Sequence, residues 1–322
     1  MKRFIIISII SILVIKAMAQ DGSFDLSFSG DGILSFRFGG TICHARSVVR
    51  QNDGMYLVAG FTGVSNHSSF ALARVTKDGL LDDGFGDHGK MTALLGTNSE
   101  LYSIALQDDG KIVGCGFSTY SSNKAISVVR YNTDGSPDNT FSGNGEFSYT
   151  LDTLWSNMAT KIILEPDGEI LVVGICQNSS DGTIVLLRLL PEGVLDTSFG
   201  NAGVAEYHTE KYNLTVNDAL VQQNGNILVC GSYHLNFSDD AYLVRFTEYG
   251  TVDTTFGTDG VSIIRSSQND DFCMSIATTS MGKIVAGGYT DSTYDVPFII
   301  ILDSAGMADS LFDVYSVSAM FP

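Results

Sequence analysis

Glycoside hydrolysis needs two carboxyl groups placed on either side of a sugar ring, and this sequence is rich in carboxyl groups. The candidates that stand outside the regular repeat of the chain are Glu100, Asp152, Glu210, Asp218 and Asp271. His44 could carry a proton beside them. Trp155, the only tryptophan, could stack on a sugar next to Asp152. No spacing pairs any two of these acids, and a chain with 36 Asp and Glu brings some together by chance.

Signatures of other chemistries are missing from the sequence. It contains no phosphate-binding loop, no nucleophile elbow and no zinc-ligand spacing, and it has only five histidines. We therefore predict no catalytic residue and expect neither a cofactor nor a bound metal. The residues that we keep as candidates for binding a ligand are His44, Glu100, Asp152, Trp155, Asp218 and Asp271.

Aspartates near glycine-rich turns raise the alternative of calcium binding, because calcium loops supply oxygen ligands. The pairs in question are Asp25 with Asp31, Asp82 with Asp87, and Asp253 with Asp259. Two other copies carry Asn144 and Asn201 instead, and no D-x-D-x-D-G series occurs. Aspartate in a turn usually accepts hydrogen bonds from its own backbone. We therefore favour a capping role over a calcium site.

The elements that must position these residues recur with a period near 57. Two independent markers share this period. One is a series of turn glycines: Gly54, Gly110, Gly168, Gly225 and Gly282. The other is the phenylalanine of a D-x-x-F element: Phe28, Phe85, Phe141, Phe199, Phe256 and Phe312. About five copies fill the chain, and we expect each phenylalanine to fill the space between neighbouring copies.

Each copy predicts four short strands. The first is a short apolar run such as Ile33–Phe38 or Val261–Arg265, and the second leads into a turn such as Asp53-Gly54. Asp-Gly and Asn-Gly between apolar runs are a strong hairpin signal, because the tight turn needs positive φ. The third strand closes on glycine, as in MYLVAG to Gly60, and the fourth contains arginine, as in FALARV with Arg74. No long amphipathic helix is predicted.

The repeated motifs DGKI-x-V-x-G and L-D-x-x-F-G-x-x-G span residues 22–312 and resemble the delta-60 repeat family of exported bacterial proteins. One copy of the second motif runs from Leu81 to Gly89. The resemblance implies a propeller-like fold and brings no established catalytic residues. Four strands per copy, repeated around a ring, also build a β-propeller by physical argument. We predict an all-β, five-bladed β-propeller of four-stranded antiparallel blades.

The two ends of the chain carry the same linker-plus-strand unit. The last copy has Leu302 at what we take for the arginine position, and only a strand near Val314–Ala319 follows. We predict that the terminal strands lie together and close the ring. The competing interpretation is an open or truncated solenoid.

Repeated charged and sulfur-containing residues are interpreted as scaffold. Four arginines each precede a linker aspartate by eight residues: Arg74 and Asp82, Arg130 and Asp138, Arg188 and Asp196, Arg245 and Asp253. We predict that each pair clasps a strand to its linker, so that Arg188→Ala destabilises the fold. Cys115 and Cys230 share one register of the repeat, which favours a small buried apolar role over a disulfide framework.

Residues 1–19 predict a signal peptide. Lys2 and Arg3 precede a short apolar stretch, and Ala17-Met18-Ala19 is a small-x-small cleavage site. Residues 20–322 then form a single propeller domain, secreted or in the cell envelope, with no membrane insertion after cleavage. Loss of three basic residues with the leader leaves 15 basic against 36 acidic residues, a net charge of −21. That charge argues against nucleic-acid binding and against docking on anionic membranes.

Two sets of loops vary between copies and are rich in Ser, Asn, Asp, Thr and Tyr. One set joins the first and second predicted strands: 39–44, 96–100, 152–157, 209–214 and 266–271. The other joins the third and fourth: 63–69, 119–124, 177–182, 233–240 and 290–297. Variable loops on a rigid scaffold are where binding usually resides. We predict an exported, non-enzymatic scaffold that binds a protein or a glycan. The alternative is a glycan-active hydrolase that uses carboxylates at the propeller channel.

Overall fold

The computed structural model of this chain is built of β-strands. It describes residues 23–64, 67–120, 123–211, 213–235, 238–265, 269–291 and 295–308. This part of the chain contains nineteen strands in five antiparallel sheets and no helix. The predicted signal peptide at 1–19 and the predicted strand Val314–Ala319 lie outside the described residues.

The sheets follow one another along the chain, and we number them 1 to 5. Sheet 1 contains β1 (Ile42–Arg50), β2 (Tyr56–Val64), β3 (His67–Val75) and β4 (Lys90–Ala93). Sheet 2 contains β5 (Asn98–Leu106), β6 (Ile112–Tyr120), β7 (Asn123–Tyr131) and β8 (Glu146–Tyr149). Sheet 3 contains β9 (Ser156–Leu164), β10 (Ile170–Gln177), β11 (Gly182–Leu189) and β12 (Val204–Thr209).

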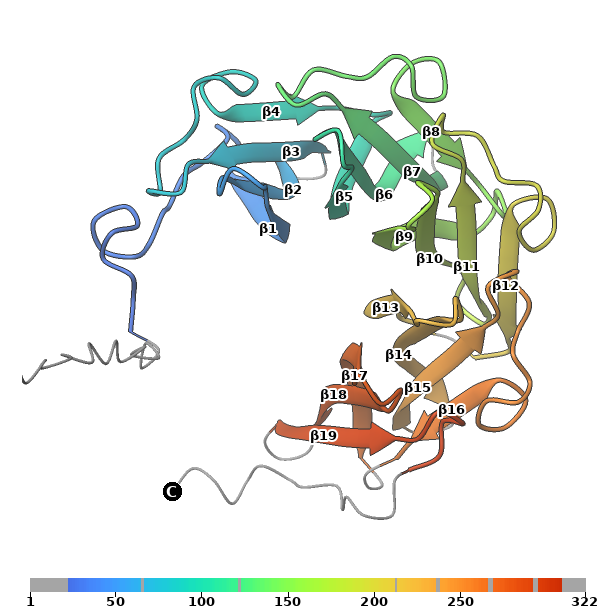
Figure 1. Cartoon of the computed structure of the whole chain (residues 1–322). Coiled ribbons are helices and arrows are strands. Elements are labelled where there is room, and N and C mark those ends of the chain that lie inside the picture. Colours follow the sequence, from blue (N-terminus) through green and yellow to red (C-terminus); the bar gives the residue numbers. More distant parts are fainter. Residues whose placement is uncertain are drawn as a thin grey trace, which may run out of the picture.

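Sheets 4 and 5 complete the series. Sheet 4 contains β13 (Asp218–Val221), β14 (Ile227–Leu235), β15 (Ser238–Phe246) and β16 (Val261–Ile264). Sheet 5 contains β17 (Asp270–Thr278), β18 (Ile284–Asp291) and β19 (Val296–Leu302), and has no fourth strand among the described residues. In every sheet each strand pairs with the next one in sequence. The sheets stand along an arc, with β1, β5, β9, β13 and β17 toward its middle (Figure 1).

Tight turns and alternating faces explain these sheets locally. Gly54 has φ of 88°, and Asp53 Oδ1 accepts a hydrogen bond of 3.0 Å from the Met55 amide, so the Asp-Gly turn caps itself. Strands in the middle of a sheet are apolar on both faces, as in ILVVGICQ of β10, where every residue up to Cys176 is buried. Such continuous burial requires another layer on each side of the sheet.

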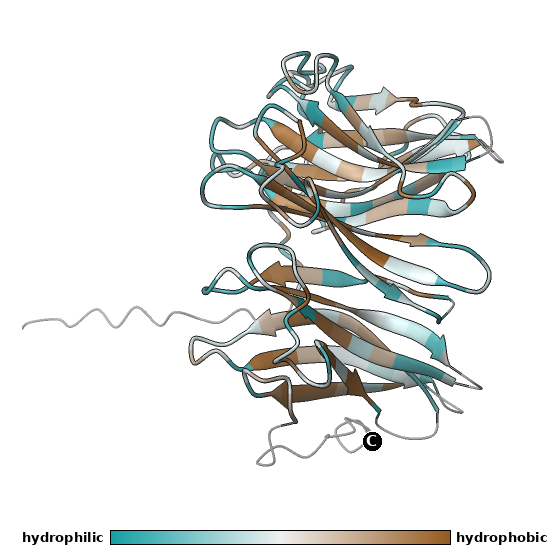
Figure 2. Ribbon diagram, turned by 90° about the vertical axis from the view of Figure 1, so that its right-hand side faces the viewer, coloured by the Kyte–Doolittle hydropathy of each residue, from teal (hydrophilic) through white to brown (hydrophobic). Residues whose placement is uncertain are grey.

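The apolar core is divided into four clusters, each lying between two consecutive sheets. Four of the six linker phenylalanines are fully buried within them, as predicted: Phe85, Phe141, Phe199 and Phe256. Phe28 is only half-buried, and Phe312 lies outside the described residues. Figure 2 shows the apolar residues concentrated along the strands and the hydrophilic residues in the loops at their ends. Each sheet is therefore too thin to form a core alone and depends on its neighbours.

The predicted arginine–aspartate clasp is present in all four copies. Nε of each arginine lies 2.5–2.8 Å from Oδ2 of its aspartate. Nη1 also donates to a backbone carbonyl in the next sheet, which the sequence did not predict; the acceptors are Thr133, Pro191, Glu248 and Ser304. The guanidinium carbon lies 4.5–5.0 Å from the centre of the linker phenylalanine ring. The clasp thus joins a strand, its linker and the next sheet.

Two details of the prediction need correction, and a third stays a prediction. The strand predicted at Ile33–Phe38 is not formed, because residues 33–38 belong to none of the five hydrogen-bonded sheets. The position equivalent to arginine in sheet 5 is Ile301 and not Leu302, because Val285 pairs with Ile301 as Leu228 pairs with Arg245. Closure of the ring by terminal strands is not shown. What the structure establishes is an all-β, propeller-like series of five sheets.

The cysteines fit the scaffold interpretation. All five lie within the described residues and are free thiols. Cys115 and Cys230 are fully buried, as predicted, and burial raises the pKa of the Cys115 thiol. Across the described ranges, no helix has the length and hydrophobicity that crossing a membrane would require.

Candidate binding surface at the loop end

The two sets of variable loops lie at the same end of the sheets. Ile42 at the start of β1 pairs with Gly63 near the end of β2, and Val64 pairs with His67 at the start of β3. The other sheets repeat this register. We call this end, formed by the two variable loop sets, the loop end. The opposite end carries the Asp-Gly turns, the linkers and the glycine turns that follow β3, β7, β11 and β15, and we call it the turn end. These further turn glycines are Gly79, Gly135, Gly193 and Gly250.

His44 and Glu100 are the candidate residues in the inner strands of sheets 1 and 2. His44 is exposed on β1, and its ring stacks on Phe61 with centroids 4.8 Å apart. Glu100 on β5 is half-buried and accepts hydrogen bonds from Tyr102 Oη at 3.2 Å and from Ser68 Oγ at 3.4 Å. Each of the two has its partners among neighbouring side chains of the scaffold.

Asp152 and Trp155 are brought together in the turn that precedes β9. Asp152 Oδ1 accepts a 2.7 Å hydrogen bond from the Leu154 amide, so this carboxylate caps its own turn. The Trp155 ring is partly buried against the core between sheets 2 and 3, with its centroid 6.5 Å from that of His208. The exposed apolar side chain of this turn is Leu154, at 86% exposure.

Asp218 joins three sheets. Its Oδ1 accepts a 2.7 Å hydrogen bond from Lys161 Nζ on β9. Its Oδ2 accepts from Ser275 Oγ at 2.9 Å and from the Ile276 amide at 3.1 Å, both on β17. At the same register Ser47 and Ser103 accept hydrogen bonds from the amides of the next sheet. Asp218 therefore occupies a scaffold position that other copies fill with serine.

Asp271 lies on β17 and is fully buried. Its Oδ1 accepts a 2.6 Å hydrogen bond from Thr290 Oγ1 on the paired strand β18. At the same register, Asn157 holds the turn before β9 by donating to the carbonyls of Asp152 and Trp155. The six predicted residues thus come from sheets 1, 2, 4 and 5 and from one turn, and only Asp152 and Trp155 share a local structure.

Sequence reasoning missed several charged groups at and below the loop end. The Arg46 guanidinium lies 5.6 Å from the Phe61 ring centre and 5.1 Å from that of Tyr102. Arg265 makes two hydrogen bonds to buried Asp240, at 2.9 and 2.6 Å. The sequence did contain a signal for the Lys161–Asp218 pair. At this position of the repeat three copies have serine, and the other two have Lys161 and Asp218. For Arg46 and Arg265 there was none, since their partners depend on the packing between strands.

Burial shifts the protonation of two groups near the loops of sheets 3 and 4. Lys211 Nζ lies 3.7 Å from the centre of the Tyr233 ring. Burial lowers the pKa of Lys211 and raises the pKa of Tyr233 to about 12. Tyr233 stacks in turn on Tyr242, with ring centroids 5.6 Å apart. Burial also raises the pKa of Tyr289, helped by Asp295 and Asp291.

The side chains of the loop end are suited to binding a ligand. The described side chains provide aromatic stacking, hydrogen bonding and paired charges. Among the residues placed by the structure, no group of three or more His, Cys, Asp or Glu is arranged to hold a metal ion. Four of the six aspartates considered as calcium ligands accept a hydrogen bond from the backbone amide two residues on, in keeping with the predicted capping role: Asp25, Asp31, Asp82 and Asp253.

Four segments of the chain match a family model described as a domain of unknown function (DUF5122) beta-propeller, at residues 51–85, 107–141, 165–199 and 222–256. These four segments are similar to the repeats of that β-propeller family. Each matched segment begins at a hairpin turn of the turn end and closes on a linker phenylalanine, so it contains the clasp and omits the loops before β1, β5, β9, β13 and β17. No curated protein sequence matches this chain.

Several solved structures are similar to the chain at low identity. One is a polysaccharide lyase that acts as an ulvan lyase, at 12% identity over 79% of this chain and 67% of that one, with a TM-score of 0.44. Another is aldose sugar dehydrogenase from Streptomyces coelicolor, at 11% over 86% and 82%, with a TM-score of 0.48. A third is an exo-β-1,3-galactanase from Clostridium thermocellum, at 13% over 88% and 66%, with a TM-score of 0.44. Likenesses this remote carry no argument about substrate or reaction.

Proposed function

We propose that this protein is an exported, non-enzymatic binding scaffold whose ligand, a protein or a glycan, docks on the loop end. The observation that carries the proposal is the division between the two ends. The turn end repeats the same clasps in four copies, whereas both variable loop sets gather at the opposite end. A rigid frame with variation confined to one surface is the arrangement that binding proteins use.

The proposal also includes a closed five-bladed ring and an N-terminal leader. It takes the five sheets as five blades of one ring that the terminal strands close, in keeping with the resemblance to the delta-60 repeat family. It also takes residues 1–19 as the leader that exports the chain to the cell envelope or beyond. An exported ring would present the loop end to large ligands without need of a deep pocket.

The loop end has a composition suited to contact with a large ligand. Its exposed apolar side chains include Val64 at 53%, Tyr120 at 43% and Leu154 at 86%. Tyrosine, serine and asparagine of the surrounding loops give stacking and adaptable hydrogen bonds. Two of the acids that a hydrolase could use, Asp218 and Asp271, are hydrogen-bonded within the scaffold.

A screen of glycans and of defined extracellular proteins on one preparation tests the proposal. Matched triple variants locate the binding surface. Val64→Ser, Tyr120→Ser and Leu154→Ser change the loop end. Leu80→Ser, Tyr249→Ser and Met281→Ser change the turn end at side chains that are 64%, 65% and 80% exposed. We expect the first triple variant to weaken binding at least tenfold and the second to leave it within twofold.

Two results contradict the proposal. One is equal loss of binding in both triple variants, which would remove the distinction between the ends. The other is release of sugar products in a hydrolysis assay on the same preparation, abolished by Glu100→Gln or Asp271→Asn in protein of unchanged circular dichroism. That second result would establish the hydrolase alternative.

A further inference from the structure

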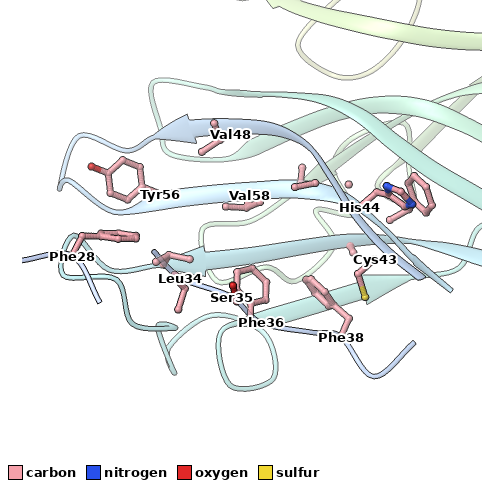
Figure 3. A pocket seen from close by; sticks show the side chains of 16 residues that line it. Phe28, Leu34, Ser35, Phe36, Phe38, Cys43, His44, Val48, Tyr56 and Val58 are labelled. Carbon is pink, nitrogen blue, oxygen red and sulfur yellow. The ribbon is translucent and has the colours of Figure 1, made fainter. Parts of the chain in front are cut away.

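Two hollows of similar volume differ in the side chains that line them. The first, of about 580 Å³, lies on sheet 1 and is lined mainly by apolar side chains such as Leu34, Phe36 and Val58 (Figure 3). The second, of about 680 Å³, lies along β16 at the edge of sheet 4, and its lining includes the cations Lys211 and Arg265. The second hollow therefore offers the charged groups that give a binding site specificity.

The cations lie on the side of this second hollow that faces sheet 3. Tyr207 lies on β12, Lys211 follows that strand, and Arg265 directly follows β16. The opposite side includes Ile300 of sheet 5, and Asp259 lies at the other end of β16. We call the side formed by Tyr207, Lys211 and Arg265 the charged hollow. Tyr207 packs against the core between sheets 3 and 4, so the charged hollow does not depend on closure of the ring.

Sheet 4 departs from the repeat next to the charged hollow. Tyr233 on β14 pairs with Asp240 on β15, and each residue is 4% exposed. In the other four sheets the paired residues at these positions are small or apolar and carry no charge: Thr62 and Ser69, Ser118 and Ala125, Cys176 and Thr183, Thr290 and Val296. Burying a phenol and a carboxylate costs free energy that the other pairs avoid, so the repeat itself does not account for this exchange.

Asp240 holds Arg265 in one orientation. Nε and Nη2 of Arg265 donate to the two carboxylate oxygens of Asp240 at 2.9 and 2.6 Å. The side chain of Asp240 is 5% exposed, whereas that of Arg265 is 55% exposed. A bidentate pair of this kind fixes the plane of the guanidinium group before a ligand arrives, which lowers the entropy cost of binding.

Lys211 provides a second cation beside Arg265. Its Nζ lies 3.7 Å from the centre of the Tyr233 ring, and it forms no ion pair with a residue that the structure describes. Burial lowers the pKa of Lys211, and Arg265 adds to this effect while Asp240 opposes it. A half-buried ammonium group without a counter-ion is stabilised by an anion that binds next to it.

The hydroxyl of Tyr233 is also left without a partner. Its Oη is buried and accepts or donates no hydrogen bond within the described part of the chain. The neighbouring Tyr242 differs, because its Oη donates to the Thr215 carbonyl at 2.6 Å. Tyr233 lines a cavity of about 10 Å³ together with Tyr207, which also lines the charged hollow. A ligand in that hollow supplies the missing partner of Tyr233, directly or through one water.

We infer that the charged hollow binds the carboxylate of an acidic sugar at the end of a glycan, with Lys211 and Arg265 as counter-ions and Tyr207 against the sugar ring. The inference rests on the proposed binding role of the loop end and chooses a glycan as its ligand. Both variable loop sets contribute to the site, since Lys211 lies in the loop 209–214 and Asp240 in the loop 233–240. The other sugars of the glycan then lie across the loop end.

Charge and shape favour a single acidic sugar. The chain carries a net charge of −18, which repels a ligand with many negative charges. Within the charged hollow Arg265 already neutralises Asp240, so one carboxylate balances the remaining charge of Lys211. Tyr207 offers an apolar ring face and a hydroxyl side by side, which matches the C–H and O–H groups of a sugar.

Calorimetric titration with paired hexasaccharides tests the inference. One member of each pair ends in glucuronic, galacturonic or mannuronic acid, and the other ends in the neutral parent sugar. We expect at least one acidic member to bind at least tenfold more tightly than its neutral counterpart. Lys211→Met should remove this preference, whereas Lys77→Met at an exposed position of the turn end should leave it within twofold. Equal affinity within every pair, or tighter binding of a peptide with a C-terminal glutamate, would overturn the inference.

Tyr233→Phe separates binding from stability. The variant removes a buried hydroxyl that has no partner, so its melting temperature should stay constant or rise, while affinity for the acidic hexasaccharide should fall at least threefold. Tyr242→Phe removes the bond to the Thr215 carbonyl, so it should lower the melting temperature and leave affinity within twofold. The reverse pattern in these two variants would overturn the inference.

The acidic-sugar site and the binding role of the loop end can fail separately. A ligand from the broader screen that is lost in the loop-end triple variant, yet binds Lys211→Met as it binds the natural chain, would overturn the acidic-sugar site. The loop end would then remain the binding surface for a ligand of another class.

Discussion

The two ends of this protein hold their acidic residues in different ways. At the turn end, four aspartates are each hydrogen-bonded to an arginine, and the same arginine reaches the next sheet. At the loop end, Glu100, Asp152 and Asp271 each have different partners. The residues that join one sheet to the next are therefore repeated from copy to copy, whereas the residues of the loop end differ between copies. Stability should therefore respond to the turn end, and ligand binding to the loop end.

Acidification should cause the largest loss of stability, because it protonates the clasp aspartates of the turn end. Burial acts to raise the pKa of Asp138, but hydrogen bonds from Thr140 and Lys111 and the charge of Arg130 outweigh it, so the pKa lies below its usual range. The net pKa shifts of the other clasp aspartates are also downward: Asp82, Asp196 and Asp253. A carboxyl with a lowered pKa in the folded state stabilises that state above its unfolded pKa, about 3.9, and loses this effect as pH falls further.

We therefore expect the free energy of unfolding to fall steeply below about pH 4. Urea unfolding between pH 2 and pH 7 measures this dependence. Asp138→Asn should flatten the acid limb while lowering stability at neutral pH. A stability that stays constant down to pH 2.5 would contradict the role of the clasps.

Removing an arginine of a clasp should have the next largest effect. Arg130 and Asp138 expose only 8% and 5% of their side chains, so Arg130→Ala removes the arginine from a buried carboxylate, which keeps Lys111 Nζ at 3.0 Å as a second cation. We expect a loss near the lower end of the about 3–5 kcal/mol that is typical of breaking a buried ion pair. Arg188→Ala should cost less, because its side chain is 15% exposed. Arg50→Ala, at an exposed position of β1, should change stability by less than about 0.5 kcal/mol. Equal melting temperatures for all three variants would refute the clasp.

Two glycines of the turn end allow the stability cost of backbone strain to be measured separately from the cost of displacing a packed side chain. Gly193 has φ of 83°, and a Cβ there would lie 2.7 Å from the Phe141 ring. Gly143 also has φ of 83°, but a Cβ there would have no neighbour within 4 Å. We expect Gly143→Ala to cost about 1 kcal/mol from strain alone. Gly193→Ala should cost about 1–3 kcal/mol more, because it displaces the buried phenylalanine. Equal losses in thermal unfolding would show that the phenylalanine moves aside freely.

Much of the turn end could be predicted from sequence, because its contacts recur at fixed spacing. The eight-residue separation of arginine and aspartate, the D-x-x-F phenylalanine and the Asp-Gly turns all proved to be local or repeated contacts. The carbonyls that accept from the arginines were not predictable, because they belong to the next sheet and carry no side-chain signal. The position of Ile301 was missed for a related reason. The paired residues Gly288 and Phe298 of sheet 5 are ten positions apart, whereas their counterparts Gly231 and Tyr242 of sheet 4 are eleven apart, and only the strand register reveals this shift.

The loop end was less predictable, since its residues occur once each. Asp218 was proposed as a binding residue because it interrupts the pattern, yet its neighbours are Lys161 and the Ile276 amide. Residues that differ between copies change either the surface or an internal contact, and the sequence alone does not separate these two cases. Burial does separate them, because Asp271 is fully buried whereas Leu154 is exposed.

The smallest expected effect tests whether Asp218 belongs to the frame. Asp218→Ser installs the residue found at this register in sheets 1, 2 and 5, so the Ile276 amide keeps an acceptor while the Lys161 pair is lost. Lys161 Nζ is partly exposed, at 36% for its side chain, and the pair therefore contributes modestly. We expect a loss of about 0.5–1 kcal/mol for the serine variant and about 1–3 kcal/mol for Asp218→Ala, which leaves a buried amide without its acceptor.

Chemical denaturation of the two variants, together with Lys161→Ser/Asp218→Ser, measures these terms. The double variant should resemble Asp218→Ser, because the ion pair is already absent from the single one. If the serine and alanine variants are equally stable and ligand binding disappears in both, then Asp218 is a ligand contact. In that case the boundary between the repeated frame and the variable surface would extend inward from the loops to the inner strands.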